Sequence, residues 1–175
     1  MVVTSAGLGT GFANALTKDW QLAPIVSLYT GQPFSVTTGS DVSLTGENLD
    51  RPTVVPDVSN PFPHTTSEWF NTTLFAGGCN NATYASNPYC VPLGTFGNAG
   101  RDIFHGPGTI QWDMSASRIF QFNERLKLQY KAEFFNIMNH ANWNAPTAGL
   151  TSSTFGQVTT FGSPRLIQMS LKMIF

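Results

Sequence analysis

The sequence predicts an all-β fold, an antiparallel meander of about four long strands with two long loops between them. Four segments alternate apolar and polar residues with a period of two, the pattern of strands that have one apolar and one polar face. Only four residues, Gln121 to Glu124, join the two central segments, as in a β-hairpin. The expected strands span residues 18–29, 109–120, 125–136 and 165–175.

The central hairpin shows the alternation most clearly. In residues 125–136, apolar side chains such as Leu128 and Tyr130 fall on one parity and charged or amide side chains on the other. Residues 109–120 repeat the pattern, and only Arg118 interrupts the apolar side. We expect the polar face to carry the charged residues Asp113, Lys127, Lys131 and Glu133.

The two outer segments differ in regularity. Residues 18–29 alternate less cleanly, and Pro24 lacks a backbone donor, which favours a sheet edge or a bulge. Residues 165–175 alternate up to the last residue of the sequence. Their apolar parity consists of Ile167, Met169, Leu171, Met173 and Phe175.

The length of these strands indicates a membrane. Strands of globular proteins usually run about five or six residues, whereas a tilted strand needs roughly 9–11 to cross a bilayer. We therefore expect the apolar face to contact lipid and the polar face to line an aqueous lumen. Because a transmembrane barrel needs at least about eight strands, the predicted fold is an incomplete section of a large transmembrane β-barrel.

Composition agrees with a surface that is not wholly aqueous. Charged residues make up 11% of the chain, and the net charge of −1 gives no indication of nucleic-acid binding. No apolar run approaches the roughly 18 residues of a membrane helix, which excludes a helical membrane protein. Residues 1–17 are small and Gly-rich and are expected to form a connector or periplasmic turn without the build of a signal peptide, so an export signal would lie outside this sequence.

The two long loops span about residues 37–108 and 137–164. The first has no sustained period, but Trp69, Phe70, Leu74 and Phe75 indicate that it is packed. It also contains Cys79 and Cys90, whose spacing fits neither a zinc site nor a redox motif. A disulfide and a pair of unpaired thiols both stay open, and a disulfide would place this loop in an oxidising compartment.

Candidate sites are few, and we expect no enzyme and no cofactor. Asp113 and Glu133 could face each other as a glycosidase pair does, but neighbouring cations favour solvated lumen residues. The histidines lack the spacing of metal ligands. The second loop offers amides and an indole that suit a sugar or peptide, or that simply cap the loop. These residues are Asn139, His140, Asn142, Trp143 and Asn144.

Several short segments, in order, resemble the C-terminal end of Oar-like TonB-dependent receptors, and the resemblance spans nearly the whole chain. The matching pieces are Trp20-Gln21-Leu22, Gly31-Gln32-Pro33-Phe34-Ser35-Val36, Arg51-Pro52, Trp69-Phe70-Asn71, Gly97-Asn98-Ala99-Gly100-Arg101, Gly106-Pro107-Gly108, Asp113-Met114-Ser115, Ala132-Glu133-Phe134-Phe135-Asn136 with Asn139-His140, and Pro164-Arg165 with Gln168 and Phe175. The chain departs from the family pattern at Asp102 and His105, where Asn and a second Arg are common.

The resemblance implies a role in substrate uptake across the outer membrane of a Gram-negative bacterium. It implies that this chain supplies wall strands and extracellular loops, and that the final strand with its terminal aromatic residue carries the signal for barrel assembly. The implied partners are outer-membrane lipid, the remaining strands and plug of the parent receptor, and the barrel-assembly machinery. TonB would be engaged only through an N-terminal part that this sequence lacks. The alternative from the residues is a soluble all-β module that binds carbohydrate or peptide.

Overall fold

The structure, a computed structural model, describes residues 3–4, 11 and 17–175. The chain divides into two compact units, and each contains segments that are distant in sequence. The sheet unit consists of Met1–Tyr29, Thr109–Asn142 and Gly162–Phe175. The loop unit consists of Thr30–Gly108 and Trp143–Phe161. Within the described ranges, no helix has the length and apolar character that crossing a membrane requires.

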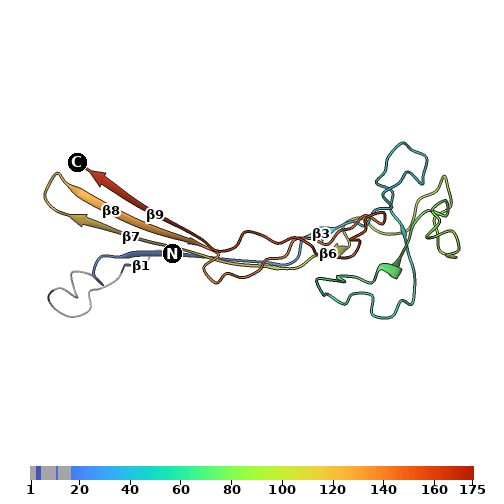
Figure 1. Ribbon diagram of the computed structural model, residues 1–175, viewed down its shortest axis with the longest axis horizontal. Helices are drawn as coiled ribbons and strands as arrows, with labels where there is room; N and C mark the ends of the chain where they lie inside the picture. The colour runs from blue at the N-terminus through green and yellow to red at the C-terminus, as the bar shows by residue number, and fades with distance from the viewer. Residues whose placement is uncertain (1–2, 5–10, 12–16) are drawn as a thin grey trace. The chain divides into compact units, whose positions relative to one another are not determined.

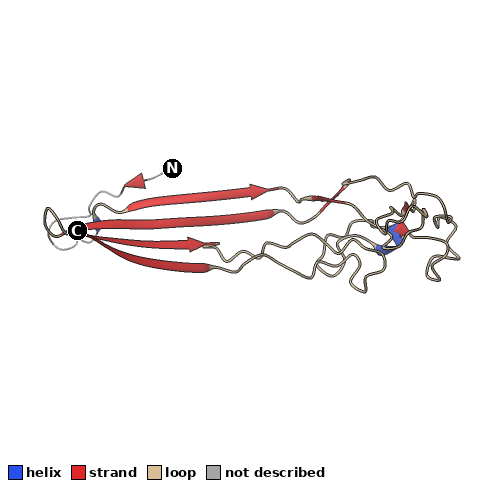
Figure 2. Cartoon of the chain, turned by 90° about the horizontal axis from the view of Figure 1, so that it is seen from above, coloured by secondary structure: helices blue, strands red, loops and turns tan. Residues whose placement is uncertain are grey.

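The sheet unit is an open antiparallel sheet in which each long strand pairs with its neighbour along the chain (Figures 1 and 2). Its strand order is β1-β2-β7-β8-β9. The long strands are β2 (Gln21–Tyr29), β7 (Thr109–Gln121), β8 (Lys127–Phe135) and β9 (Leu166–Ile174). The structure thus confirms the predicted fold class, an all-β antiparallel meander that does not close into a barrel.

The strand boundaries differ from expectation by up to three residues, and local hydrogen bonds account for the shift at the hairpin. β8 begins at Lys127 rather than at residue 125. The Asn123 side-chain oxygen accepts hydrogen bonds from the backbone N–H groups of Arg125, at 3.0 Å, and Leu126, at 2.7 Å. This Asx-type turn satisfies the backbone donors of Arg125 and Leu126 locally, so the ladder starts only at Lys127.

The sheet also contains a short strand that the sequence analysis did not predict. β1 (Val3–Thr4) pairs antiparallel with β2, Val3 opposite Leu22 and Thr4 opposite Gln21. It lies within the connector expected over residues 1–17, so that part of the expectation is corrected. Most of the remaining connector lies outside the described residues. A strand of two residues carries no periodic signal, since one alternation cannot be distinguished from chance.

The loop unit folds around its own hydrophobic core. Val36, Phe70, Leu74, Phe75 and Phe104 are its buried residues. Phe75 contacts both Phe70 and Phe104 edge-on, with ring centroids 5.3 and 5.2 Å apart. The secondary structure around this core is short and consists of β3 (Pro33–Phe34) with β6 (Phe104–His105), β4 (Thr53–Val54) with β5 (Phe75–Ala76), and the one-turn 3-10 helix η1 (Thr72–Leu74).

Both predicted loops contribute to this one core. Thr37 bridges to Gly149, and its backbone N–H donates to the Ala148 carbonyl at 3.0 Å. The Leu150 N–H donates in turn to the Thr37 carbonyl at 2.9 Å. Ala148, Leu150 and Phe155 then pack against the core. The 143–161 segment is therefore part of the same folded unit as residues 30–108.

Candidate functional site

The register of the sheet separates two faces, and the first is almost wholly apolar. Partners on this face include Val26 opposite Trp112 and Met114 opposite Phe134. Its residues are Leu22, Pro24, Val26 and Leu28 on β2, Ile110, Trp112, Met114, Ala116, Arg118 and Phe120 on β7, Leu128, Tyr130, Ala132 and Phe134 on β8, and Ile167, Met169, Leu171 and Met173 on β9. We call this the apolar face.

Arg118 is the charged residue on the apolar face, as its place in the alternation predicted. Its side chain is 9% exposed, and its guanidinium carbon lies 4.6 Å from the centroid of the Phe120 ring. A cation above an aromatic face is attracted by the ring quadrupole. The Trp20 ring meets Tyr130 edge-on at 6.0 Å, which places two large aromatic side chains together on this sheet.

The opposite face carries the four predicted lumen residues. Alternation and register place Asp113, Lys127, Lys131 and Glu133 together on this polar face. The Lys131 ammonium pairs with the Glu133 carboxylate at 2.7 Å. The Gln111 amide donates to both oxygens of Asp113, at 3.1 and 3.0 Å. These half-exposed groups satisfy one another, as expected for a wet surface.

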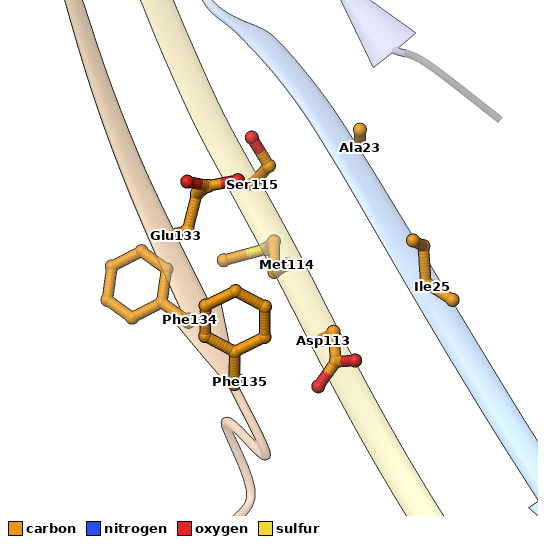
Figure 3. A pocket seen from close by; sticks show the side chains of 8 residues that line it. All are labelled: Ala23, Ile25, Asp113, Met114, Ser115, Glu133, Phe134 and Phe135. Atoms are coloured by element: carbon orange, nitrogen blue, oxygen red, sulfur yellow. The ribbon is translucent and has the colours of Figure 1, made fainter. Parts of the chain in front are cut away.

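A shallow hollow lies on this part of the sheet and is drawn in Figure 3. Asp113 and Ser115 reach it from β7 and Glu133 from β8. Its volume of about 90 Å³ is room for roughly three waters and lies below the 300 Å³ at which ligand pockets begin. Ser115, rather than Asp113, is the cross-strand partner of Glu133, and Asp113 lies diagonally across from it.

Asn136, which the candidate list did not include, organises the polar end of β8. It is 5% exposed and adopts a positive φ of 50°, a conformation that Asn tolerates better than most residues. Its backbone N–H donates to Asp113 at 2.9 Å, and its side-chain amide donates to the carbonyls of His140, at 2.9 Å, and Ser163, at 3.2 Å. The sequence signals for Asn136 are its position directly after an apolar strand end and its place in the receptor-like segment Ala132-Glu133-Phe134-Phe135-Asn136.

Three of the predicted ligand-contact residues serve the same end of the sheet unit. The Asn142 side-chain oxygen accepts from the Ile110 N–H at 2.8 Å and lies 3.0 Å from the His140 Nδ1. The Asn139 side-chain oxygen accepts from the Arg165 N–H at 3.0 Å. These contacts hold the residue before β9 and the start of β7.

The other two ligand-contact candidates lie in the loop unit. The Asn144 amide donates to the Thr160 hydroxyl at 2.9 Å, and its backbone N–H donates to the Thr160 carbonyl at 3.0 Å. The Trp143 ring packs edge-on against Phe161, with centroids 5.5 Å apart. The five candidates are therefore divided between the sheet unit and the loop unit.

The whole final strand is exposed, including its apolar parity. Ile167, Met169, Leu171 and Met173 are 48 to 66% exposed, although each lies in a paired strand. Phe175 follows directly after β9 and is 91% exposed. Soluble monomers rarely leave so continuous an apolar patch in water, so this face requires an apolar environment.

The two cysteines of the loop unit form a disulfide and are not unpaired thiols. In this bond between Cys79 and Cys90, the Cα atoms lie 5.0 Å apart. The backbone supports it, because the Cys79 N–H donates to the Val91 carbonyl and the Val91 N–H donates to the Gly77 carbonyl, each at 2.9 Å. Among the described residues, no group of three or more His, Cys, Asp or Glu side chains is arranged to hold a metal ion.

Comparison with known proteins agrees with the two-faced sheet. The sequence of residues 3–168, nearly the whole chain, matches the family described as the outer membrane beta barrel domain. Comparison with curated proteins and with solved structures finds no significant match. The match covers β2, β7, β8 and the loop unit, and it ends within β9. The chain belongs to the outer membrane beta barrel domain family and is an outer-membrane β-barrel protein.

Proposed function

We propose that this chain is the C-terminal section of the barrel of an Oar-like TonB-dependent receptor in a Gram-negative bacterium. It contributes wall strands, extracellular loops and the terminal assembly strand to substrate uptake. The observation that carries the proposal is the apolar face, continuous over four antiparallel strands, with Asp113, Lys127, Lys131 and Glu133 on the opposite face. Lipid outside and water inside is the arrangement that such alternation serves.

The open sheet supports a larger parent barrel. All nine residues of β9 are exposed, and its outer edge has no neighbouring strand among the described residues. An unpaired backbone edge is not stable in hydrocarbon, because each unsatisfied N–H or C=O group costs several kcal/mol. The remaining strands and the plug of the parent receptor would supply the missing partners.

The connections support an orientation. Tyr29 pairs with Thr109 and Phe135 pairs with Leu166, so both long connections leave the same end of the sheet. The short Asx-type turn at Asn123 lies between the other ends of β7 and β8. Bacterial outer-membrane barrels have long extracellular loops and short periplasmic turns. In the proposed receptor, the loop unit is extracellular, and the turn and Phe175 are periplasmic.

The proposed role is transport without catalysis or a bound cofactor. Within this proposal the barrel-assembly machinery inserts the parent, and TonB engages it through its N-terminal part. Asp113 and Glu133, the two carboxylates considered as a catalytic pair from the sequence, have protein partners. Asp113 accepts hydrogen bonds from Gln111 and Asn136, and Glu133 forms an ion pair with Lys131. Their contacts are those of a solvated lumen wall.

A cross-linking experiment on the full-length parent receptor tests the proposal. The parent, with cysteines placed in its N-terminal segment, is expressed together with a TonB that carries single cysteines. We expect the parent to fractionate with the outer membrane and to form a disulfide-linked adduct with TonB. The matched control is the same parent with the N-terminal segment deleted, which should keep its membrane fraction and lose the adduct.

The outcomes separate the two levels of the proposal. A heat-modifiable outer-membrane barrel that never cross-links to TonB would leave the family assignment intact and overturn the TonB-dependent role. A monodisperse protein that needs no detergent would instead favour the soluble ligand-binding module. Such a protein would have to hide an apolar face that the structure leaves exposed.

A further inference from the structure

The loop unit contains an open groove that none of the sequence-predicted sites includes. Its volume is about 350 Å³, within the 300–1,000 Å³ range of ligand pockets. Six residues line it, and they combine two guanidinium groups with hydroxyls, one carboxylate and one apolar side chain. These residues are Ser35, Thr37, Leu49, Arg51, Arg101 and Asp102.

Two motifs that lie far apart in the sequence meet to build this groove. The Gly97 N–H donates to the Arg51 carbonyl at 3.1 Å, and the Ala99 N–H donates to the Pro52 carbonyl at 3.0 Å. A Cβ atom on Gly97 would collide with the backbone of Pro52, so glycine is needed for this close approach. The pairing of Arg51-Pro52 with Gly97–Arg101 fixes the backbones that present both arginines.

The charge distribution of the loop unit gives weight to the position of its two arginines. Arg51 and Arg101 are its only Lys or Arg residues, and both line the same groove. The unit is otherwise acidic, which would keep anions away from most of its surface. Its acidic residues are Asp41, Glu47, Asp50, Asp57, Glu68 and Asp102.

The two guanidinium groups are also not committed to partners. Within the described part of the chain, neither Arg51 nor Arg101 forms an ion pair or a side-chain hydrogen bond. Asp102, the carboxylate of the groove, is held instead by Ser35. Its Oδ1 accepts from the Ser35 Oγ at 2.7 Å, and its backbone N–H donates to the same Oγ at 2.8 Å. Among the described residues, the five N–H donors of each guanidinium therefore have no protein acceptor.

We propose that this groove binds a small organic anion, a carboxylate or phosphate monoester with an apolar portion. Paired guanidinium groups bind these planar or tetrahedral oxyanions with charge-assisted hydrogen bonds, often bidentate. The Ser35 and Thr37 hydroxyls add neutral donors, and the exposed Leu49 side chain offers the apolar contact. The assignment goes beyond the proposed transport role and holds for the loop unit whether or not the parent engages TonB.

Titration calorimetry on the folded full-length parent in detergent micelles tests this assignment with phenyl phosphate as the probe. We expect saturable binding of phenyl phosphate that weakens as NaCl is raised, because the contact is ionic. Benzoate shows whether the groove prefers a carboxylate or a phosphate. Binding of benzoate or of phenyl phosphate supports the assignment. Benzyl alcohol, which has the ring without the charge, should not bind. If inorganic phosphate bound with the same affinity as phenyl phosphate, the groove would not recognise the apolar portion of the anion, and that part of the assignment would be overturned.

Charge-matched variants locate the binding. Arg101→Gln and Arg51→Gln should each weaken phenyl phosphate binding by about tenfold or more, the loss typical of a charge-assisted hydrogen bond. Arg125→Gln, the same change at an exposed turn of the sheet unit, should leave affinity unchanged. Asp102→Asn should tighten binding, since it removes the like charge from the groove. Arg101→Gln is the variant least at risk of misfolding, because the Arg101 side chain is exposed. Wild-type affinity for phenyl phosphate in this variant would overturn the assignment. An equal loss of affinity in Arg125→Gln would overturn it too.

Discussion

At the scale of single residues, short polar side chains stabilise most of the irregular backbone in this protein. Asn136 satisfies carbonyl groups on two segments, and Asn123 satisfies the turn of the hairpin. Asp50 does the same in the loop unit. Its Oδ2 accepts from the Ser43 N–H at 2.7 Å, and its Oδ1 accepts from the Ser43 hydroxyl at 2.9 Å. Each of these contacts provides a partner for a polar group that folding removes from water.

The buried Asp50 carboxylate makes loop-unit stability depend on pH. Desolvation, the largest single effect, raises the pKa of Asp50, but the hydrogen bonds from Ser43 and Val42 together outweigh it and hold the pKa below its ordinary value. A carboxyl whose pKa is lowered by folding stabilises the protein above its unfolded pKa, about 3.9. We expect this stabilisation to be lost as pH falls from about 4 through the lower folded pKa.

Urea unfolding of the loop unit at a series of pH values, followed by near-ultraviolet circular dichroism, measures this contribution. Asp50→Asn should lower the free energy of unfolding near neutral pH by about 1–3 kcal/mol, because the Ser43 donors then lose their carboxylate acceptor. It should also flatten the acid dependence of that free energy, because an amide does not titrate. Asp57→Asn, the same change at an exposed position, is the control. An acid dependence unaltered in Asp50→Asn would contradict the assignment to this carboxylate.

At the scale of elements, the long strands could be predicted because each has two environments. Alternating faces leave a signal in the sequence wherever one side is apolar for nine or more residues, as in β8 and β9. The two-residue strands β3, β4, β5 and β6 leave none, since their pairing depends on partners distant in the chain. Sequence periodicity therefore predicts the wall and not the strands of the loop unit.

The end of β9 provides a test of barrel assembly in the full-length parent. Deleting Phe175, or replacing it with Asp, should lower the amount of folded receptor in the outer membrane severalfold while synthesis is unchanged. The reason is that an exposed terminal aromatic residue after an apolar strand is the proposed assembly signal. Heat-modifiability on gels and quantitative immunoblotting of membrane fractions measure the two quantities.

A matched substitution separates the signal from a general effect of charge. Phe96→Asp places the same change at an exposed phenylalanine of the loop unit and should leave assembly unaltered. If the amount of folded receptor in the outer membrane is unchanged after Phe175 is deleted or replaced, Phe175 is not part of the assembly signal.

At the scale of the whole molecule, the sequence predicted two separate loops, and the structure combines them in one unit. The contacts responsible join residues more than a hundred positions apart, such as Thr37 and Gly149, and local patterns carry no information about them. The same limit applies to the candidate groove. Arg51 and Arg101 each belong to a recognisable motif, but only the fold shows that the motifs are adjacent.

The disulfide is the covalent restraint of this unit. Replacing both Cys79 and Cys90 by Ser should lower the stability of the loop unit by roughly 2.5–3 kcal/mol, the chain-entropy estimate for so short a closed loop. Denaturant unfolding measures the change, and wild-type chain under reducing conditions should match the double variant. Identical midpoints for oxidised wild type and the double variant would show that the bond does not stabilise the fold.

The position of the hairpin between the two halves of the loop unit imposes an order on biosynthesis. Residues 30–108 leave the ribosome before β7 and β8, whereas residues 143–161, with Ala148, Leu150 and Phe155, follow them. The aromatic core therefore stays incomplete until the hairpin exists, and a chain interrupted before residue 143 would expose it to proteases and chaperones.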